Sequence, residues 1–122
     1  MKQIALATGG FDPLHGGHIK YLKAASMLGG KLVVGVNSDD WLSRKKGRPF
    51  MLWKDRASIV KELSFVDEVI SFDDSDDSAI DAIQKVLDAH KDSKIIFCNG
   101  GDRTKTNIPE MTLDGIDFKF SV

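Results

Sequence analysis

The sequence predicts an α/β fold in which about five parallel strands form one doubly wound sheet with helices on both faces. Strand-like apolar runs alternate along the chain with segments of helical periodicity. Each run is continuously apolar, which is typical of strands that are buried on both faces. The chain has 122 residues, of which 42% are hydrophobic, and this is enough for one core. We therefore expect residues 1–122 to form a single domain.

The expected strands are short apolar runs bounded by glycine or polar residues. They cover residues 3–8, 31–36, 67–72, 94–99 and 116–122. Between them, apolar residues recur three and four positions apart, as they do on one face of a helix.

This spacing predicts a helix over 17–28, which the pair Gly29-Gly30 ends. It also predicts a capped helical turn at 37–43 and a helix over about 54–63. The segment 44–50 is basic and contains glycine and proline, so we expect a loop there. A last helix begins after residue 78 and carries Ile80, Ile83, Val86 and Leu87 on one face.

Charge and composition argue against several classes of protein. The chain carries 17 basic and 18 acidic side chains, so no strong field favours nucleic acid or an anionic membrane. Cys98 is the only cysteine, which leaves no disulfide framework and no cysteine-rich zinc site. The segment MKQIALAT is too short an apolar run for a signal peptide, and no stretch approaches the length of a membrane span. We expect a cytoplasmic protein that binds neither nucleic acid nor membrane.

The segment GGFDPLHGGHIKYL, residues 9–22, joins the first expected strand to the first expected helix. Its glycines allow the backbone to approach a ligand closely, and unpaired N–H groups at a helix start bind phosphate. His15 and His18 are three residues apart, so both imidazoles lie on one side of the first turn, where they can donate hydrogen bonds. The pattern favours a phosphate site. A surface histidine pair and a metal site are the alternatives, and neither G-x-x-x-x-G-K nor G-x-G-x-x-G occurs in this segment.

These motifs together resemble the H-x-G-H signature of the cytidylyltransferase-like nucleotidyltransferases. This family includes glycerol-3-phosphate and phosphoethanolamine cytidylyltransferases and heptose-phosphate adenylyltransferases. The resemblance begins in GFDPLHGGHIKYL and continues in the family's order through KLVVGVNSDDW, KKGRPF, the DR pair at 55–56, FVDEVI at 65–70 and NGGD at 99–102. It implies a Rossmann-like fold and an enzyme of the nucleotidyltransferase class.

Such enzymes join CTP or ATP to a small phosphorylated acceptor and release pyrophosphate. The acceptor is a polyol, sugar or amino-alcohol phosphate, and its phosphate oxygen attacks the α-phosphorus directly. The resemblance implies Mg²⁺ as the ion that neutralises the triphosphate. Homodimers are common in the family, so a homodimer is one expected state. The choice between CTP and ATP and the identity of the acceptor stay open at this point.

The resemblance also implies roles for individual residues. The catalytic set would be His15, His18, Lys46 and Arg56, with Lys45 as the alternative to Lys46 if the alignment shifts by one position. The nucleotide would bind Gly9, Gly10, Phe11, His15, His18 and Asp102. The acceptor would bind Asp12 and Asp39. No residue is implied as a metal ligand.

The chain departs from the family pattern in two places. Ser64 stands where some members carry an arginine, and the chain stops at Val122, on the last expected strand. In the family a Ser/Thr-rich segment follows that strand, opens a final helix and contacts the triphosphate. We therefore expect this domain to lack the C-terminal helix segment and to bind nucleotide more weakly than a full-length relative does. A nucleotide-binding module without catalysis and an unrelated, flavodoxin-like domain are the other functions considered.

Other conspicuous residues are expected to be structural. The acidic run 73–77 is interpreted as a helix start favoured by the helix dipole. Trp41 and Trp53 are expected to pack in the core, with a place in a ligand pocket as the alternative. Cys98 lies inside an expected strand and should be buried and inert.

Overall fold

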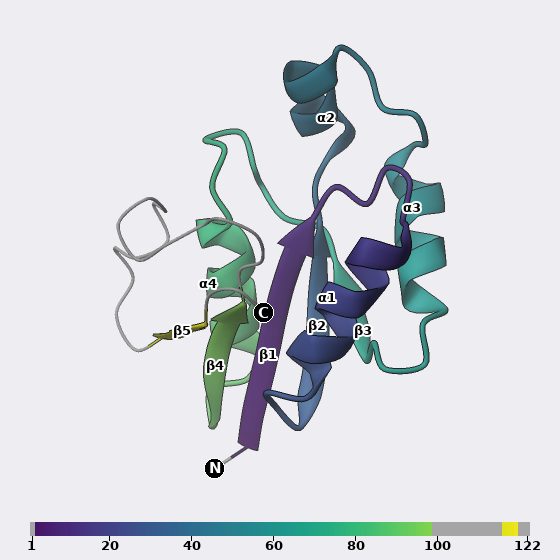
Figure 1. Ribbon diagram of the computed structural model, residues 1–122. Helices are drawn as coiled ribbons and strands as arrows, with labels where there is room; N and C mark the ends of the chain where they lie inside the picture. The colour runs from purple at the N-terminus through teal and green to yellow at the C-terminus, as the bar shows by residue number, and fades with distance from the viewer. Residues whose placement is uncertain (1, 99–115, 120–122) are drawn as a thin grey trace.

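The predicted α/β architecture is confirmed by a computed structural model, which describes residues 2–98 and 116–119. Five parallel strands in this part of the chain form one sheet with the order β3-β2-β1-β4-β5 (Figure 1). Their bounds are β1 Lys2–Gly9, β2 Lys31–Val36, β3 Glu68–Ile70, β4 Ser93–Cys98 and β5 Ile116–Lys119. The strand order reverses at β1, and in such sheets ligands bind beyond the carboxyl ends of the strands at this point.

The helices cover both faces of the sheet, as predicted. Their bounds are α1 Gly16–Ser26, α2 Asp39–Lys46, α3 Trp53–Lys61 and α4 Ile80–Ala89. Alternate residues of β1 face opposite layers, because side chains alternate along a strand. Ile4 and Leu6 pack in a cluster with α4, whereas Ala5 and Ala7 pack in a second cluster with α1 and α3. The short helix α2 extends beyond the carboxyl edge of the sheet (Figure 1).

The expected loop over 44–50 is wrong at its start. Residues 44–46 form the last turn of α2, and the helix ends where Gly47 takes a φ of 94°. The reason is a complete set of helix signals around a short segment. Ser38 accepts a hydrogen bond from the backbone N–H of Trp41, acidic residues occupy the first turn, and basic residues complement the dipole in the last turn.

The third strand is shorter than expected, at Glu68–Ile70 instead of 67–72. No helix among the residues described in the structure is long and apolar enough to cross a lipid bilayer.

Candidate active site

The connection between β1 and α1 brings an aromatic ring over the end of the central strand. Phe11 has a φ of 51° and its side chain is buried. A Cβ atom on Gly9 would lie 2.8 Å from Cζ of Phe11, so only glycine fits beneath this ring. The ring of Phe11 in turn meets His18 edge to face, with 5.2 Å between centroids. The closeness of backbone and ring therefore depends on glycine at position 9.

The two histidines lie on one side of the first turn of α1, as predicted. His15 is the N-cap residue, and its Nδ1 accepts a hydrogen bond of 3.0 Å from the backbone N–H of Gly17. The backbone N–H of His15 donates to Nδ1 of His18 at 3.2 Å. The rings stack with centroids 3.8 Å apart. Both Nδ1 atoms are acceptors, so in each neutral ring the proton is on Nε2, which becomes a hydrogen-bond donor.

Glycine at position 17 preserves this arrangement. A Cβ atom there would lie 2.9 Å from Cε1 and 3.2 Å from Nδ1 of His15. The imidazole would have to move, whereas a Cβ on Gly16 would meet nothing within 4 Å. Sterics therefore require glycine at position 17 of H-G-G-H, whereas they do not require it at position 16.

The electrostatics of the helix start suit an anion. The first turn of α1 contains no acidic residue, so its positive end is not neutralised from within the helix. Burial and then the charge of His15 lower the pKa of His18 below its ordinary value of 6.5. His18 is therefore neutral at pH 7, and it offers its Nε2–H without needing a proton. Two imidazole donors and a helix N-terminus form an arrangement that can bind phosphate oxygens.

Asp12 anchors the connection between α2 and α3 to the site. Its side chain is 2% exposed and accepts hydrogen bonds from the backbone N–H groups of Phe50 (2.6 Å) and Met51 (2.7 Å). Nζ of Lys46 lies 2.6 Å from Oδ2 of Asp12 and also donates to its carbonyl oxygen. Burial opposes ionisation of Asp12, but these hydrogen bonds and the charge of Lys46 outweigh it and lower the pKa. In this structure both carboxylate oxygens bind protein groups, so the expected acceptor contact of Asp12 stays a prediction.

Arg56, which the resemblance places in the catalytic set, lies beneath the site. Its side chain is 0% exposed. The guanidinium donates to the carbonyl oxygens of Met51 (2.9 Å), Gly10 (2.9 Å) and Asn37 (2.7 Å). It also donates to Oδ1 of Asp39 at 2.6 Å. Because the Arg56 side chain has no exposed surface, it cannot contact a phosphate directly in this structure. Its hydrogen bonds instead make it a positioning residue beneath the site.

Three further predicted residues are Asp39, Lys45 and Asp102. Asp39, expected to bind the acceptor, is the ion-pair partner of Arg56. Lys45 is exposed at the end of α2, with Nζ 4.8 Å from the centre of the Trp41 ring. Asp102, expected to bind the nucleotide, lies outside the described residues.

Asp74 is a residue of the site region whose role sequence reasoning missed. It is 3% exposed, and it accepts hydrogen bonds from Nδ2 of Asn37 and from the backbone N–H and hydroxyl of Ser38. The acidic run was expected to favour the start of its own helix, but Asp74 instead holds the start of α2. Its partners are 36 and 37 positions away in the sequence, so no local pattern could have shown the contact.

Membership of the cytidylyltransferase-like family is shown by comparison with known proteins. Residues 6–116 match this family, and the chain therefore belongs to it. The fold and family are those of nucleotidyltransferases.

Two relatives and one solved structure are similar to this chain over most of its length. The chain is 39% identical over 109 residues to the bifunctional protein HldE of Blochmanniella floridana, and 45% identical over 87 residues to that of Campylobacter concisus. These matches cover 88% and 70% of this chain but only 21% and 18% of the relatives, so the chain spans about a fifth of their length. A solved structure of the lipopolysaccharide core biosynthesis protein from Thermoplasma volcanium is 26% identical with a TM-score of 0.75, over 98% of this chain and 96% of that one.

Proposed function

We propose that this domain transfers CMP or AMP from CTP or ATP to a small phosphorylated acceptor and releases pyrophosphate. The observation that carries the proposal is the pair of imidazole Nε2–H donors at the N-terminus of α1, beyond the carboxyl end of the central strand. Family membership and the HldE relatives support it. The proposed acceptor is a polyol, sugar or amino-alcohol phosphate.

In the proposed reaction an oxygen of the acceptor phosphate attacks the α-phosphorus. A new P–O–P bond forms as the bond to the β-phosphate oxygen breaks, and pyrophosphate leaves with that oxygen. His15 and His18 donate hydrogen bonds to the phosphoryl oxygens as charge shifts onto them. Preorganised donors of this kind are among the largest contributions to catalysis in such reactions. The protein supplies no nucleophile of its own in this scheme.

Lys46 and Mg²⁺ would balance the remaining charge of the triphosphate. In this structure Nζ of Lys46 is paired with the carboxylate of Asp12 beside the β1–α1 connection, and it would turn from Asp12 to the triphosphate to balance its charge. Within the described ranges no group of three or more His, Cys, Asp or Glu side chains could hold a metal ion, and the carboxylates of Asp12 and Asp39 face cations. We propose that Mg²⁺ arrives bound to the nucleotide, as part of the substrate.

The test combines a substrate screen with a variant that preserves the fold. CTP and ATP are incubated with sugar, polyol and choline-type phosphates while pyrophosphate release is measured. His15→Asn keeps a good N-cap acceptor but removes the Nε2–H donor. We expect kcat to fall about 10²–10³-fold for this variant, with an unchanged melting temperature.

His15→Ala serves as the matched comparison, because it loses the cap as well and should cost about 1 kcal/mol of stability. Nucleotide binding without pyrophosphate release for any acceptor would instead identify a non-catalytic binding module. Full activity of His15→Asn would show that the Nε2–H donor of His15 is not needed for catalysis.

A further inference from the structure

A side chain of α1 reaches across the point where the strand order of the sheet reverses. The helix packs over β1 and β2, whereas the hydroxyl group of Tyr21 donates a hydrogen bond of 2.9 Å to the carbonyl oxygen of Cys98, at the end of β4. Because β4 and β2 lie on opposite sides of β1, the tyrosine side chain crosses the central strand. It therefore joins the helix that carries the histidine pair to the strand beyond β1.

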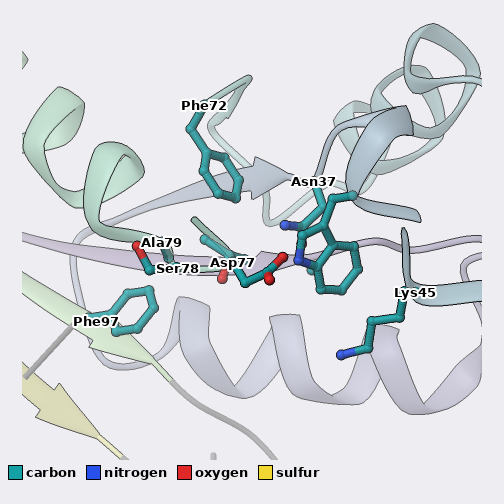
Figure 2. A pocket seen from close by; sticks show the side chains of 10 residues that line it. Asn37, Lys45, Phe72, Asp77, Ser78, Ala79 and Phe97 are labelled. Carbon is teal, nitrogen blue, oxygen red and sulfur yellow. The ribbon is translucent and has the colours of Figure 1, made fainter. Parts of the chain in front are cut away.

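The end of β4 is also one wall of a cavity. This cavity has a volume of about 200 Å³ and lies at the carboxyl ends of β1, β2 and β4, where Phe97 is part of its lining (Figure 2). Side chains alternate along a strand, so Phe97 packs in the core cluster on the α4 face and Cys98 packs in the cluster on the α1 face. Two successive residues of β4 thus line the cavity and accept the hydrogen bond from Tyr21.

Apolar packing constrains the position of α1 less sharply than a hydrogen bond does. Leu22 and Ala25 of this helix are fully buried, but the free energy of apolar burial depends on area and has no preferred direction. A hydrogen bond has a preferred distance and angle. The bond from Tyr21 therefore restrains sliding and rotation of α1 in a way that the contacts of Leu22 and Ala25 do not.

His18 lies about one turn before Tyr21 on the same face of the helix, since residues three apart are neighbours on a helix surface. A shift of α1 at Tyr21 would move the His18 ring as well, because backbone hydrogen bonds hold each turn of a helix together. The His18 ring meets Phe11 edge to face and stacks on His15. The placement of both imidazoles over the end of β1 thus depends on where Tyr21 holds α1.

The hydroxyl group distinguishes Tyr21 from an apolar residue that would fill the same space. The ring packs against the core cluster on the α1 face, and a phenylalanine would make the same apolar contacts. A partly buried tyrosine hydroxyl usually finds a hydrogen-bond partner, and here the partner lies at the carboxyl edge of the sheet. Ligands bind along this edge in doubly wound folds, so the bond is made where small displacements matter for a bound substrate.

We propose that the hydroxyl group of Tyr21 positions the histidine pair for the transfer reaction by fixing α1 to the end of β4. The proposal rests on the transferase function proposed above. Tyr21 is a positioning residue that acts through His18 and does not touch the reacting phosphate. Its hydrogen bond sets the distance between the imidazole donors and the β4 wall of the cavity, so that groups on both sides of β1 can contact one substrate.

Tyr21→Phe tests the proposal because it removes the hydroxyl group and keeps the ring. The carbonyl oxygen of Cys98 then loses a donor, so the melting temperature should fall by a few degrees. We expect kcat to fall about tenfold, because small errors in the placement of catalytic groups are costly. KM for the nucleotide should change by less than about twofold, since a misplaced donor that acts in the transition state affects kcat more than substrate binding.

A conservative replacement tests the hydrogen bond by itself. Incorporation of 4-aminophenylalanine at position 21 keeps a donor at the same end of the ring. It should restore most of the kcat that Tyr21→Phe loses, together with most of the melting temperature. A lack of rescue in a protein that has regained its melting temperature would overturn the proposal.

Two control variants separate positioning from stability. Ser26→Ala removes a hydroxyl group of the same helix whose hydrogen bond, 2.6 Å to the carbonyl oxygen of Lys23, stays within α1, and it should leave kcat unchanged. Ile95→Val creates a small cavity on the α4 face of β4, where Ile95 is fully buried. Its melting temperature should fall without a change in kcat. An equal fall in kcat for Ile95→Val and Tyr21→Phe would assign the effect to stability alone.

A measurement without substrate separates this proposal from the proposed catalysis. The imidazole signals of the three histidines are followed by NMR during pH titrations of the wild type and of Tyr21→Phe. Burial and the charge of His15 lower the pKa of His18, so a less restrained α1 should expose the ring and let this pKa rise towards 6.5. His90 follows α4 and lies beside the first residues of β1 and β4, so it serves as an internal reference.

The kinetic and NMR results together decide the matter. A fall in kcat with a rise in the pKa of His18 supports the positioning role. Unchanged His18 signals would overturn it even if kcat falls, because Tyr21 would then act by another route. A shift of His18 in a protein that releases no pyrophosphate with any acceptor would support the link between Tyr21 and His18 and reject the transferase function.

Discussion

At the start of α1, the residue that caps the helix also carries a hydrogen-bond donor on the side where we propose that phosphate binds. Small polar residues such as Ser, Thr, Asp and Asn are the usual N-caps, but these place no second donor beyond the helix end. In His15 the Nδ1 atom caps Gly17, and Nε2 carries the proton on the far side of the ring. His18 completes the capping box by accepting from the backbone N–H of His15. The hydrogen bonds that start the helix therefore also fix the tautomers of both rings.

The same residues predict how stability responds to acid. Burial and the charge of His15 lower the pKa of His18 in the folded protein. As the pH falls below about 6.5, the unfolded chain binds a proton that the folded protein does not, so the free energy of unfolding decreases. Urea titrations at pH 7.5 and pH 5.5 should show a larger loss for the wild type than for His18→Gln, whose amide can still accept at this position of a capping box. Equal losses in the two proteins would contradict this assignment.

At the scale of elements, α2 and the connections around it are tied down by two buried charged residues. Asp74 binds the N-cap residue Ser38, and Arg44 in the last turn donates to the carbonyl oxygen of Asp74. Both ends of α2 are thus attached to the same segment before α4. Arg56 joins the connections that follow β1, β2 and α2 by binding one carbonyl oxygen from each. The basic end of α2 is thereby held where Lys46 contacts Asp12.

Removal of Arg56 should destabilise this arrangement strongly. Arg56→Met would leave three carbonyl oxygens without their donor and the carboxylate of Asp39, which is 37% exposed, without its partner. A buried acceptor left unpaired costs about 1–3 kcal/mol. We expect a loss of this size in the free energy of unfolding, measured by chemical denaturation. Arg48→Met is the matched control, because Arg48 is exposed in the α2–α3 connection, and it should cost little. A loss below about 1 kcal/mol for Arg56→Met would show that the guanidinium is not a structural hub.

At the scale of the whole molecule, the central position of β1 buries its neighbours on both sides. β4 pairs with β1 and β5, and its last residue, Cys98, is 1% exposed. Burial raises the pKa of the Cys98 thiol to about 12. Because the thiolate is the reactive form, Cys98 should be inert in the native protein, as the sequence predicts.

Alkylation gives a measurement of this protection. Iodoacetamide at pH 8 should leave Cys98 unmodified in native protein and modify it in urea, as followed by mass spectrometry. Modification under native conditions therefore reports transient opening of the sheet at β4. Rapid modification of the native protein would show that the carboxyl end of this strand is far less stable than the parallel pairing suggests.

The sequence by itself determined the layers of this protein and the position of its histidine pair. Apolar runs mark the strands because parallel strands are covered on both faces, and the spacing of His15 and His18 places both rings on one turn, since helical geometry is local. Only the tertiary structure decided the roles of Arg56, Asp12 and Asp74. Each of these side chains binds groups from segments distant in the sequence, and a buried charge is recognised only when the donors or acceptors that surround it are known.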